Sequence, residues 1–151
     1  MRETMFRGKG IFNGEWFYGD LLKYEDERGK HLQIVTSNKG CRMHNHTVDP
    51  ATVGQFTGLL DKNDVEIYEG DIVKGVAIAS EGGFNYLGKV VFYNQSNVHG
   101  YFVEDAAGGA WRIEQLQKQI SLDNITFLAG EVIGNIHDNP DALEGSDADE
   151  S

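Results

Sequence analysis

Three potential metal ligands lie close together in one segment of this 151-residue chain. Cys41, His44 and His46 have the spacing C-x₂-H-x-H, and thiolate and imidazole are groups that Zn²⁺ binds well. Asp49 or His31 would be the fourth ligand of a tetrahedral site. However, the spacing is not an established zinc pattern, and the chain has a single cysteine. We therefore expect no metal or other cofactor, and interpret this segment as solvated.

No other side chains have the spacing of a catalytic group. Glu66 and Glu69 fall on opposite faces of a strand, so their carboxylates cannot converge on one substrate. The Gly-Gly pairs at 82–83 and 108–109 lack the other residues of a phosphate-binding loop. The sequence contains neither a nucleophile-elbow nor a metalloprotease motif. We expect no enzyme activity and no catalytic residues.

Residues 28–48 form a basic stretch in an otherwise acidic chain. The net charge is −11, and residues 138–151 contribute six acids and no base, so the remainder carries −11 + 6 = −5. The stretch has no acidic residue, and its arginines and lysines are Arg28, Lys30, Lys39 and Arg42. It also lacks the aromatic rings on which a single-strand binder stacks bases. We interpret it as a solvated loop, and nucleic-acid binding through this loop, masked by the acidic tail, stays open as an alternative.

The composition predicts that strands position these residues. The chain has 19 glycines but 2 prolines, with 8 Phe, 6 Tyr and 2 Trp, which is typical of a β-rich protein. The central element is a hairpin within residues 52–73, with residues 61–64 as its turn. A strand over 71–79 follows. The residues that we expect to face the core from this strand are Ile72, Val76 and Ile78.

The N-terminal region predicts another hairpin. Residues 4–12 and 15–24 are joined at Asn13-Gly14, a dipeptide that favours a type I′ turn. We expect one face of the second arm to carry Trp16, Tyr18 and, past a kink at Gly19, Leu21. Phe17 is expected on the opposite face. Aromatic residues on both faces indicate burial within the chain or a subunit contact.

Regular elements are expected along most of the remaining chain. A strand covers 31–36, whereas residues 37–50 lack periodicity and are interpreted as a loop, with a helical turn capped by Asp49 at its end. A buried strand over 86–93 pairs with 100–105. A short helix over 113–120 and strands over 122–127 and 131–137 complete the chain.

Several motifs in order resemble the YopX-like proteins of bacteriophages and prophages. The strongest are VGQFTGL at 53–59, IYEGDIV at 67–73 and EVIGNIHDNP at 131–140. FRGK at 6–9 and WFYGDL at 16–21 fit the family's opening. In this chain Asp64 stands where members commonly have a turn glycine, which indicates a different turn type. The resemblance implies a mostly β fold without an assigned activity.

We interpret the motif residues as residues that shape the backbone. Asp71 is expected to accept backbone N–H bonds, while Gly70 adopts a conformation closed to residues with a Cβ. The residues that we assign to this structural role are Gly54, Gln55, Thr57, Gly58, Tyr68, Gly70, Asp71, Glu131, Gly134 and Asn135.

The sequence thus predicts an all-β fold, with minor helix, of antiparallel sheets. We expect one domain over 1–143, in which an N-terminal sheet (1–50) is interlaced with an SH3-like, barrel-like part (51–138), and an acidic disordered tail over 144–151. No apolar run is long enough to span a membrane, and the start of the chain lacks a signal peptide's apolar region, so we expect a cytoplasmic protein of the host bacterium. We expect it to bind an unknown host or phage protein, and homo-oligomers are an open alternative.

Overall fold

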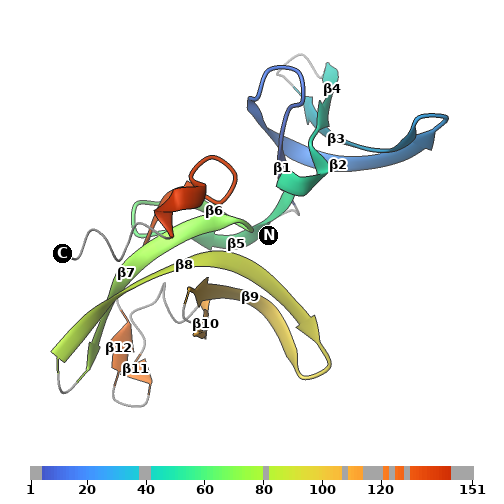
Figure 1. Cartoon of the computed structure of the whole chain (residues 1–151). Helices are drawn as coiled ribbons and strands as arrows, with labels where there is room; N and C mark the ends of the chain where they lie inside the picture. The colour runs from blue at the N-terminus through green and yellow to red at the C-terminus, as the bar shows by residue number, and fades with distance from the viewer. Residues whose placement is uncertain are drawn as a thin grey trace. The chain divides into compact units, whose positions relative to one another are not determined.

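The computed structural model of the chain confirms the all-β fold (Figure 1). It describes residues 5–37, 42–79, 82–106, 109–113, 121–122, 125–127 and 130–143, with the backbone alone for residues 37, 79, 84, 121–122 and 125–127. Pairing is antiparallel in every sheet ladder of these residues. The chain divides into two compact units, Met1–Phe56 and Thr57–Ser151. They are called unit 1 and unit 2 below.

Unit 1 is a strongly curved sheet with the strand order β4-β3-β2-β1-β5. Its strands are β1 (Phe6–Lys9), β2 (Trp16–Asp26), β3 (Gly29–Ser37), β4 (Met43–Val48) and the start of β5 (Gly54–Leu60). The 3₁₀ helix η1 (Pro50–Thr52) separates β4 from β5, and Asp49 caps it as expected, because its Oδ1 accepts the N–H of Ala51 at 3.0 Å.

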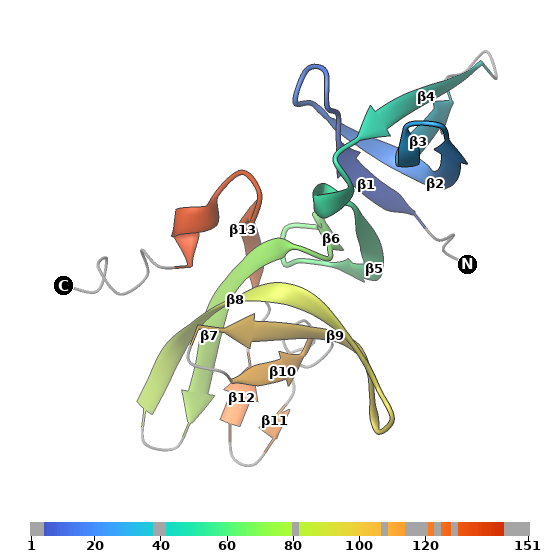
Figure 2. The same ribbon diagram turned by 45° about the vertical axis from the view of Figure 1, so that its right-hand side comes forward.

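The curvature brings β4 back to the chain that follows β1 (Figure 2). Gly10 and Val48 form a β-bridge, and the N–H of Ile11 donates to the carbonyl of Thr47 at 3.1 Å. The four strands β1–β4 therefore close into a small barrel, with Ile34 and Val48 buried inside. Gly8 lies against this closure, since a Cβ at Gly8 would lie 2.8 Å from the Val48 side chain.

Two predictions for unit 1 are corrected. Residues 43–48 of the expected loop form β4, which pairs with β3 from Leu32↔Val48 to Ser37↔Met43. The strand was missed because its side chains are mostly polar, so the alternation carries no hydropathy signal. The predicted hairpin of β1 and β2 is confirmed, but Lys9 pairs with Trp16, so the connection spans residues 10–15 and is not a two-residue type I′ turn.

Unit 2 is a sheet curled into a half-barrel, with the order β10-β9-β8-β7-β12-β11 and β13 also on β7 (Figure 1). The end of β5 and β6 (Glu66–Tyr68) form the central hairpin, around the predicted turn at 61–64. The other elements are β7 (Asp71–Ala79), β8 (Gly82–Gln95), β9 (Val98–Asp105), β10 (Ala110–Arg112), β11 (Ser121–Leu122), β12 (Ile125–Phe127), β13 (Glu131–Asn135) and the 3₁₀ helix η2 (Pro140–Ala142).

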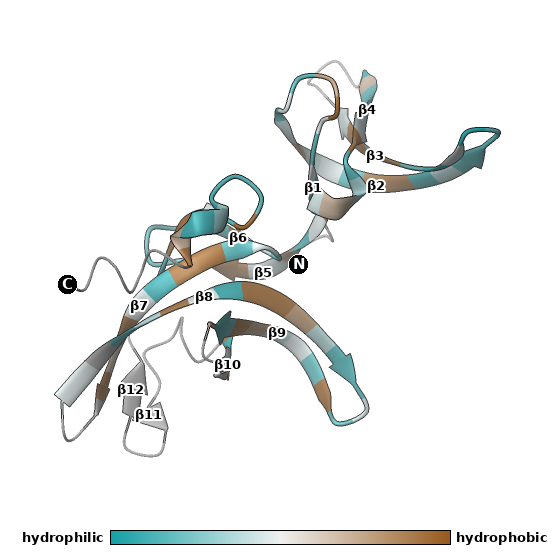
Figure 3. Ribbon diagram, in the orientation of Figure 1, coloured by the Kyte–Doolittle hydropathy of each residue, from teal (hydrophilic) through white to brown (hydrophobic). Residues whose placement is uncertain are grey.

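The core of unit 2 lies on the inner face of this sheet. Figure 3 colours stretches of β7 and β8 brown for apolar residues. The buried residues of the core are Ile67, Val73, Ala77, Tyr86, Val90, Val103 and Ile113. Burial raises the pKa of Tyr86 to about 12.

The inward face of β7 differs from the predicted one. Ile72 is buried as expected, but Val76 and Ile78 are exposed, and Val73 and Ala77 face the core instead. The inner set includes Gly75, which leaves room for the ring of Tyr86 on β8. The ring of Tyr86 thus fits inside only when Gly75 and the residues on its side of β7, Val73 and Ala77, face the interior. Of the predicted helix over 113–120, residues 114–120 lie outside the described residues.

Candidate functional site

The predicted hairpin turn is held by a buried carboxylate that the sequence analysis did not single out. Oδ1 of Asp61 accepts the N–H groups of Asn63 at 2.7 Å and Val65 at 2.9 Å. Its Oδ2 accepts the N–H of Val132, on β13, at 2.9 Å. Asp64 in the same turn has a φ of 65°, the left-handed conformation that favours glycine. Asp61 therefore joins the turn to β13 and has a structural role.

Gly70 and Asp71 have the conformations that the motif predicted. Gly70 has a φ of 94°, and Oδ2 of Asp71 accepts the N–H of Tyr68 at 2.7 Å. The backbone of Gly70 also donates to Val90 and accepts from Ile136, each at 2.9 Å. This turn therefore ties β6, β8 and the chain after β13 together.

The motif at 131–140 also holds the backbone through a side chain. Oδ1 of Asn135 accepts the N–H groups of His137 and Asp138, both at 2.9 Å. Gly134 is required nearby, since a Cβ there would lie 2.5 Å from Oδ1 of Asn139. Glu131 lies beside Lys62, with the nearest Nζ and Oε1 atoms 3.9 Å apart.

The residues of the motif at 53–59, on β5, also contact backbone. Gly54 is buried and pairs with Arg7 of β1, and Gln55 pairs with Phe6. Thr57 donates its hydroxyl to the carbonyl of Ile67 at 2.8 Å, and Gly58 has a φ of 89°. These contacts of the motif residues are thus mainly contacts with backbone.

Of the three metal candidates, the structure describes His44 and His46. His44 and His46 lie on the same side of β4, with ring centroids 6.4 Å apart. His46 stacks on Phe17 at 3.7 Å, and its Nε2 lies 3.2 Å from the Thr36 hydroxyl. Cys41 lies outside the described residues. No group of three His, Cys, Asp or Glu that could hold a metal ion occurs within the part of the chain that the structure describes.

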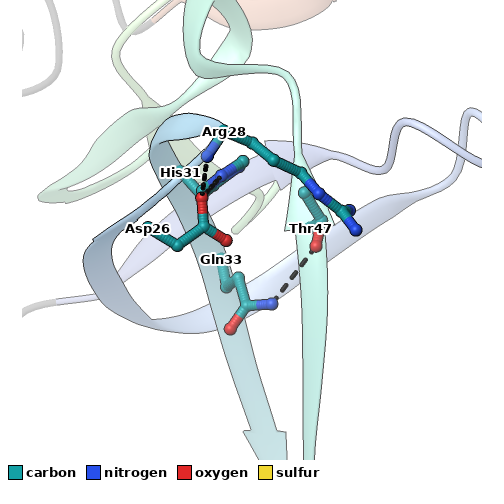
Figure 4. Close-up of polar contacts among 5 residues, drawn as sticks. All are labelled: Asp26, Arg28, His31, Gln33 and Thr47. Atoms are coloured by element: carbon teal, nitrogen blue, oxygen red, sulfur yellow. Dashed lines mark hydrogen bonds and ion pairs between the residues drawn. The ribbon is translucent and has the colours of Figure 1, made fainter.

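Strand pairing places acidic residues against the basic stretch. Glu25 is opposite Lys30 in the β2–β3 ladder. Oδ1 of Asp26 accepts the Arg28 N–H at 2.8 Å and lies 2.8 Å from Nε2 of His31 (Figure 4). The hydrogen bond from His31 and then the one from Arg28 lower the pKa of the Asp26 carboxyl. The exposed side chain of Arg42 precedes β4, and Lys39 lies outside the described residues.

The outward side of the small barrel displays apolar and aromatic side chains. Tyr18, Leu22 and Tyr24 alternate along β2, and their exposed fractions are 47%, 40% and 39%. We define the outer face of unit 1 as these three residues and their neighbours on the same side of β2, β3 and β4. The neighbours, as the ladder registers place them, are Asp20, His31, Gln33, Val35, Asn45 and Thr47.

The polar part of the outer face is ordered by side-chain hydrogen bonds. Gln33 donates to the Thr47 hydroxyl at 3.2 Å (Figure 4), and Asn45 donates to Oε1 of Gln33 at 3.2 Å. The ring of Tyr24 stacks on His31 with centroids 4.9 Å apart. The face thus combines exposed rings with amide groups of fixed orientation.

The outer face corrects the predicted grouping along β2. β2 is one continuous strand from Trp16 to Asp26, so Leu21 falls on the side of Phe17 and Leu22 joins Tyr18. Tyr18 is also exposed, so of the two alternatives for this strand, burial within the chain does not hold for its ring. Tyr18, Leu22 and Tyr24 all occupy even positions, but Asp20 between them and the apolar Phe17 and Leu21 on the other side hide this face in the sequence.

A family model described as "YopX protein" matches residues 5–144, nearly the whole chain. The chain belongs to this family. The match confirms the family that the sequence motifs indicated. The crystal structure of protein EF1440 from Enterococcus faecalis is similar to this YopX chain, with 22% identity over 95% of this chain and 99% of that chain, and a TM-score of 0.49. Among curated proteins, none matches the chain. Within its described residues, no helix is long and apolar enough to cross a membrane.

Proposed function

We propose that this YopX-family chain is a non-catalytic binding module that acts through protein–protein contacts. By the resemblance of its motifs, it is a phage or prophage protein that works in the host cytoplasm. The outer face of unit 1 is its docking surface. The partner presents an apolar recess for Tyr18, Leu22 and Tyr24, with a basic rim that complements the acidic turn of Glu25 and Asp26.

The exposure of three large side chains in one row of β2 carries this proposal. Aromatic residues dominate the binding energy of protein interfaces, and surrounding polar groups add hydrogen bonds. Tyr18 lies where β2 pairs with β1, and Leu22 and Tyr24 lie where it pairs with β3, so docking orders little additional backbone. Gln33 and Asn45 supply amide groups beside them.

The amino-acid types of the face favour a protein partner over nucleic acid. Glu25 and Asp26 lie beside Lys30 and His31, which reduces the positive charge of this part of the basic stretch. One observation supports the alternative of a nucleic-acid-associated regulatory protein. The ring of Tyr24 on β2 stacks on His31, so the sheet supplies an aromatic residue that the stretch over 28–48 lacks by itself.

The test compares a variant of the outer face with a matched surface variant. Leu22→Glu/Tyr24→Glu places two charges on the face, whereas Ile11→Glu/Phe12→Glu replaces two exposed apolar residues in the loop over 10–15. A partner is captured from host lysate with the tagged wild type and purified. Its affinity, measured by calorimetry, is expected to fall at least about 100-fold in the first variant, as loss of anchor residues does.

The outcomes separate the two candidate functions. Equal affinities of both variants for the partner would place the docking surface elsewhere and reject the proposal. Retention of a fluorescent oligonucleotide at low salt, lost at high salt and in the outer-face variant, would favour nucleic acid instead. Matching circular-dichroism melting curves establish that each variant is folded.

A further inference from the structure

β4 is the longest of the strands that pair with another strand on one side only, within the described part of the chain. It has six residues, whereas the other such strands, β6, β10, β11 and β13, have two to five. Figure 2 shows β4 as the last strand of the sheet in unit 1. A strand in this position has a row of N–H and C=O groups that no neighbouring strand pairs, and such a row is a template for another strand.

The closure of the small barrel covers one end of β4. The N–H of Ile11 donates to the carbonyl of Thr47, and the chain then turns back, because the N–H of Gly10 donates to the carbonyl of Glu15 at 2.8 Å. Beyond the bridge of Gly10, the described residues contain no further strand pairing on this side of β4. We call this side of β4, at residues 43–46, the open edge.

The alternation of the strand backbone identifies the groups that line the open edge. Thr47 accepts a hydrogen bond on this side, and the N–H of Asp49 donates on this side to the carbonyl of Lys9 at 2.9 Å. In a strand, the N–H and C=O of one residue point to the same side, and those of the next residue point to the other. Met43 and Asn45 therefore direct their backbone N–H and C=O groups to the open edge.

β4 also lacks the features that prevent strand addition. Its sequence contains no Pro, Lys, Arg, Asp or Glu, and its ladder with β3 has no bulge. In contrast, the three-residue strands β6 and β10 contain Glu66 and Arg112, and β13 contains Glu131. The side chains of residues 43–45 are exposed, and Met43 is 65% exposed. A second strand can therefore approach the open edge.

We propose that the open edge of β4 binds an extended peptide segment of a partner protein, which adds a strand to the sheet. The segment runs antiparallel to β4 and continues the line that Gly10 begins. Main-chain hydrogen bonds to Met43 and Asn45 hold it, and its apolar side chains pack on Met43. Residues 28–48 contain no acid, and the exposed Arg42 precedes β4, so the segment carries acidic residues between its apolar ones.

The probe for this site is a displayed library of random peptides of about 12 residues, long enough to span the strand. The library is panned on the immobilised full chain, and we expect it to enrich peptides in which β-branched or aromatic residues alternate with Asp or Glu. The affinity of the enriched peptides is then measured by fluorescence anisotropy for the wild type and its variants.

Asn45→Pro is the variant that tests the open edge, and Asn45→Ala is its matched control. Proline is tolerated on an edge strand where the N–H faces away from the sheet. It removes the donor at the open edge, so the affinity is expected to fall at least about 10-fold. Both variants lose the hydrogen bond from the Asn45 side chain to Gln33, and Asn45→Ala is expected to stay within about 3-fold of the wild type.

Amide hydrogen exchange of the wild type measures the same contact without a substitution. Bound peptide is expected to slow exchange at Met43 and Asn45. Failure to enrich any peptide, equal affinities of the two variants, or unchanged exchange at both amides would overturn the proposal. Matching circular-dichroism melting curves establish that Asn45→Pro is folded, and if it is not, the exchange experiment decides.

Two further outcomes would assign another occupant or another site. Exchange at the same amides that slows with rising protein concentration, without peptide, would show a second copy on the open edge and overturn the proposal. Peptides that lose affinity in Leu22→Glu/Tyr24→Glu but not in Asn45→Pro would bind the outer face. That result would overturn the open edge as a site and leave the proposed function intact.

Discussion

The two units differ in what holds the fold and in what they expose. Unit 1 has eight bases and seven acids, a net charge of +1, and closes four strands around Ile34 and Val48. Unit 2 has a net charge of 5 − 17 = −12, a larger apolar core and buried carboxylates that bind backbone N–H groups. Acidic residues therefore have two roles in this chain. In unit 2 two of them fix turns from inside, whereas in unit 1 Asp26 makes an exposed contact.

The largest expected effect is in unit 2, at Asp61. Asp61→Ala leaves three backbone N–H groups without their acceptor, and we expect a loss of about 3 kcal/mol or more in the free energy of unfolding. Urea denaturation measures it. Lys62→Ala in the same turn removes a surface ion pair and is expected to cost about 0.5 kcal/mol or less. Equal losses of unfolding free energy in the two variants would show that the buried carboxylate of Asp61 stabilises unit 2 no more than a surface ion pair does.

The closure of unit 1 is tested at Gly8. Gly8→Ala places a methyl group 2.8 Å from Val48, and we expect a loss of about 1–3 kcal/mol, as for other overpacked cores. Urea denaturation followed by tryptophan fluorescence reports on this unit through Trp16 when Trp111 of unit 2 is replaced by Phe in every variant compared. The double variant Gly8→Ala/Val48→Gly removes every Val48 side-chain atom that the new methyl group would meet, so the two substitutions should cost less together than the sum of their separate effects. Additive costs would contradict the packing of β1 on β4.

The smallest effect is expected at the exposed pair of Asp26 and His31. The pKa of Asp26 is lowered from its ordinary value of 3.8, so the pair stabilises unit 1 above that pH, and this stabilisation is lost as the pH falls through the lowered pKa. In His31→Gln the pKa should rise toward 3.8, because the largest cause of the shift is removed. An NMR titration of the Asp26 carboxyl carbon measures it.

Arg28→Gln is the control for this titration. It keeps the backbone N–H that donates to Asp26, so the pKa of Asp26 should stay low. A rise in Arg28→Gln that equals the rise in His31→Gln would assign the shift to the guanidinium charge. Charge at a distance, and not the contact with His31, would then lower the pKa of Asp26 in unit 1.

The sequence predicted the turns and caps that neighbouring residues determine. The turn residues at 61–64 specified the central hairpin, and Gly70-Asp71 specified a turn that only a glycine with positive φ and a short carboxylate satisfy. Asp49 specified the cap of η1. The motifs also indicated the family, because they recur in a fixed order along nearly the whole chain.

Other features depended on contacts between distant segments. β4 has too few apolar residues to show alternation, and its pairing with β3 and Gly10 defines it. The inward side of β7 was assigned to Val76 and Ile78, but the ring of Tyr86 occupies the space over Gly75 and places Val73 and Ala77 inside. Contacts at the candidate site could not be predicted from the sequence for the same reason. Acids at 25–27 were visible in the sequence, yet only strand register places them against the bases.

By itself the sequence determined the β class, the turns, the family and the uneven distribution of charge, because these follow from the residue types and their near neighbours. The tertiary structure decided which side of each strand faces solvent. A strand with apolar residues on both sides can bury either one, and the choice depends on the rings and backbone that neighbouring strands bring against it. The exposure of Tyr18, Leu22, Tyr24 and Phe92 is the result of that choice.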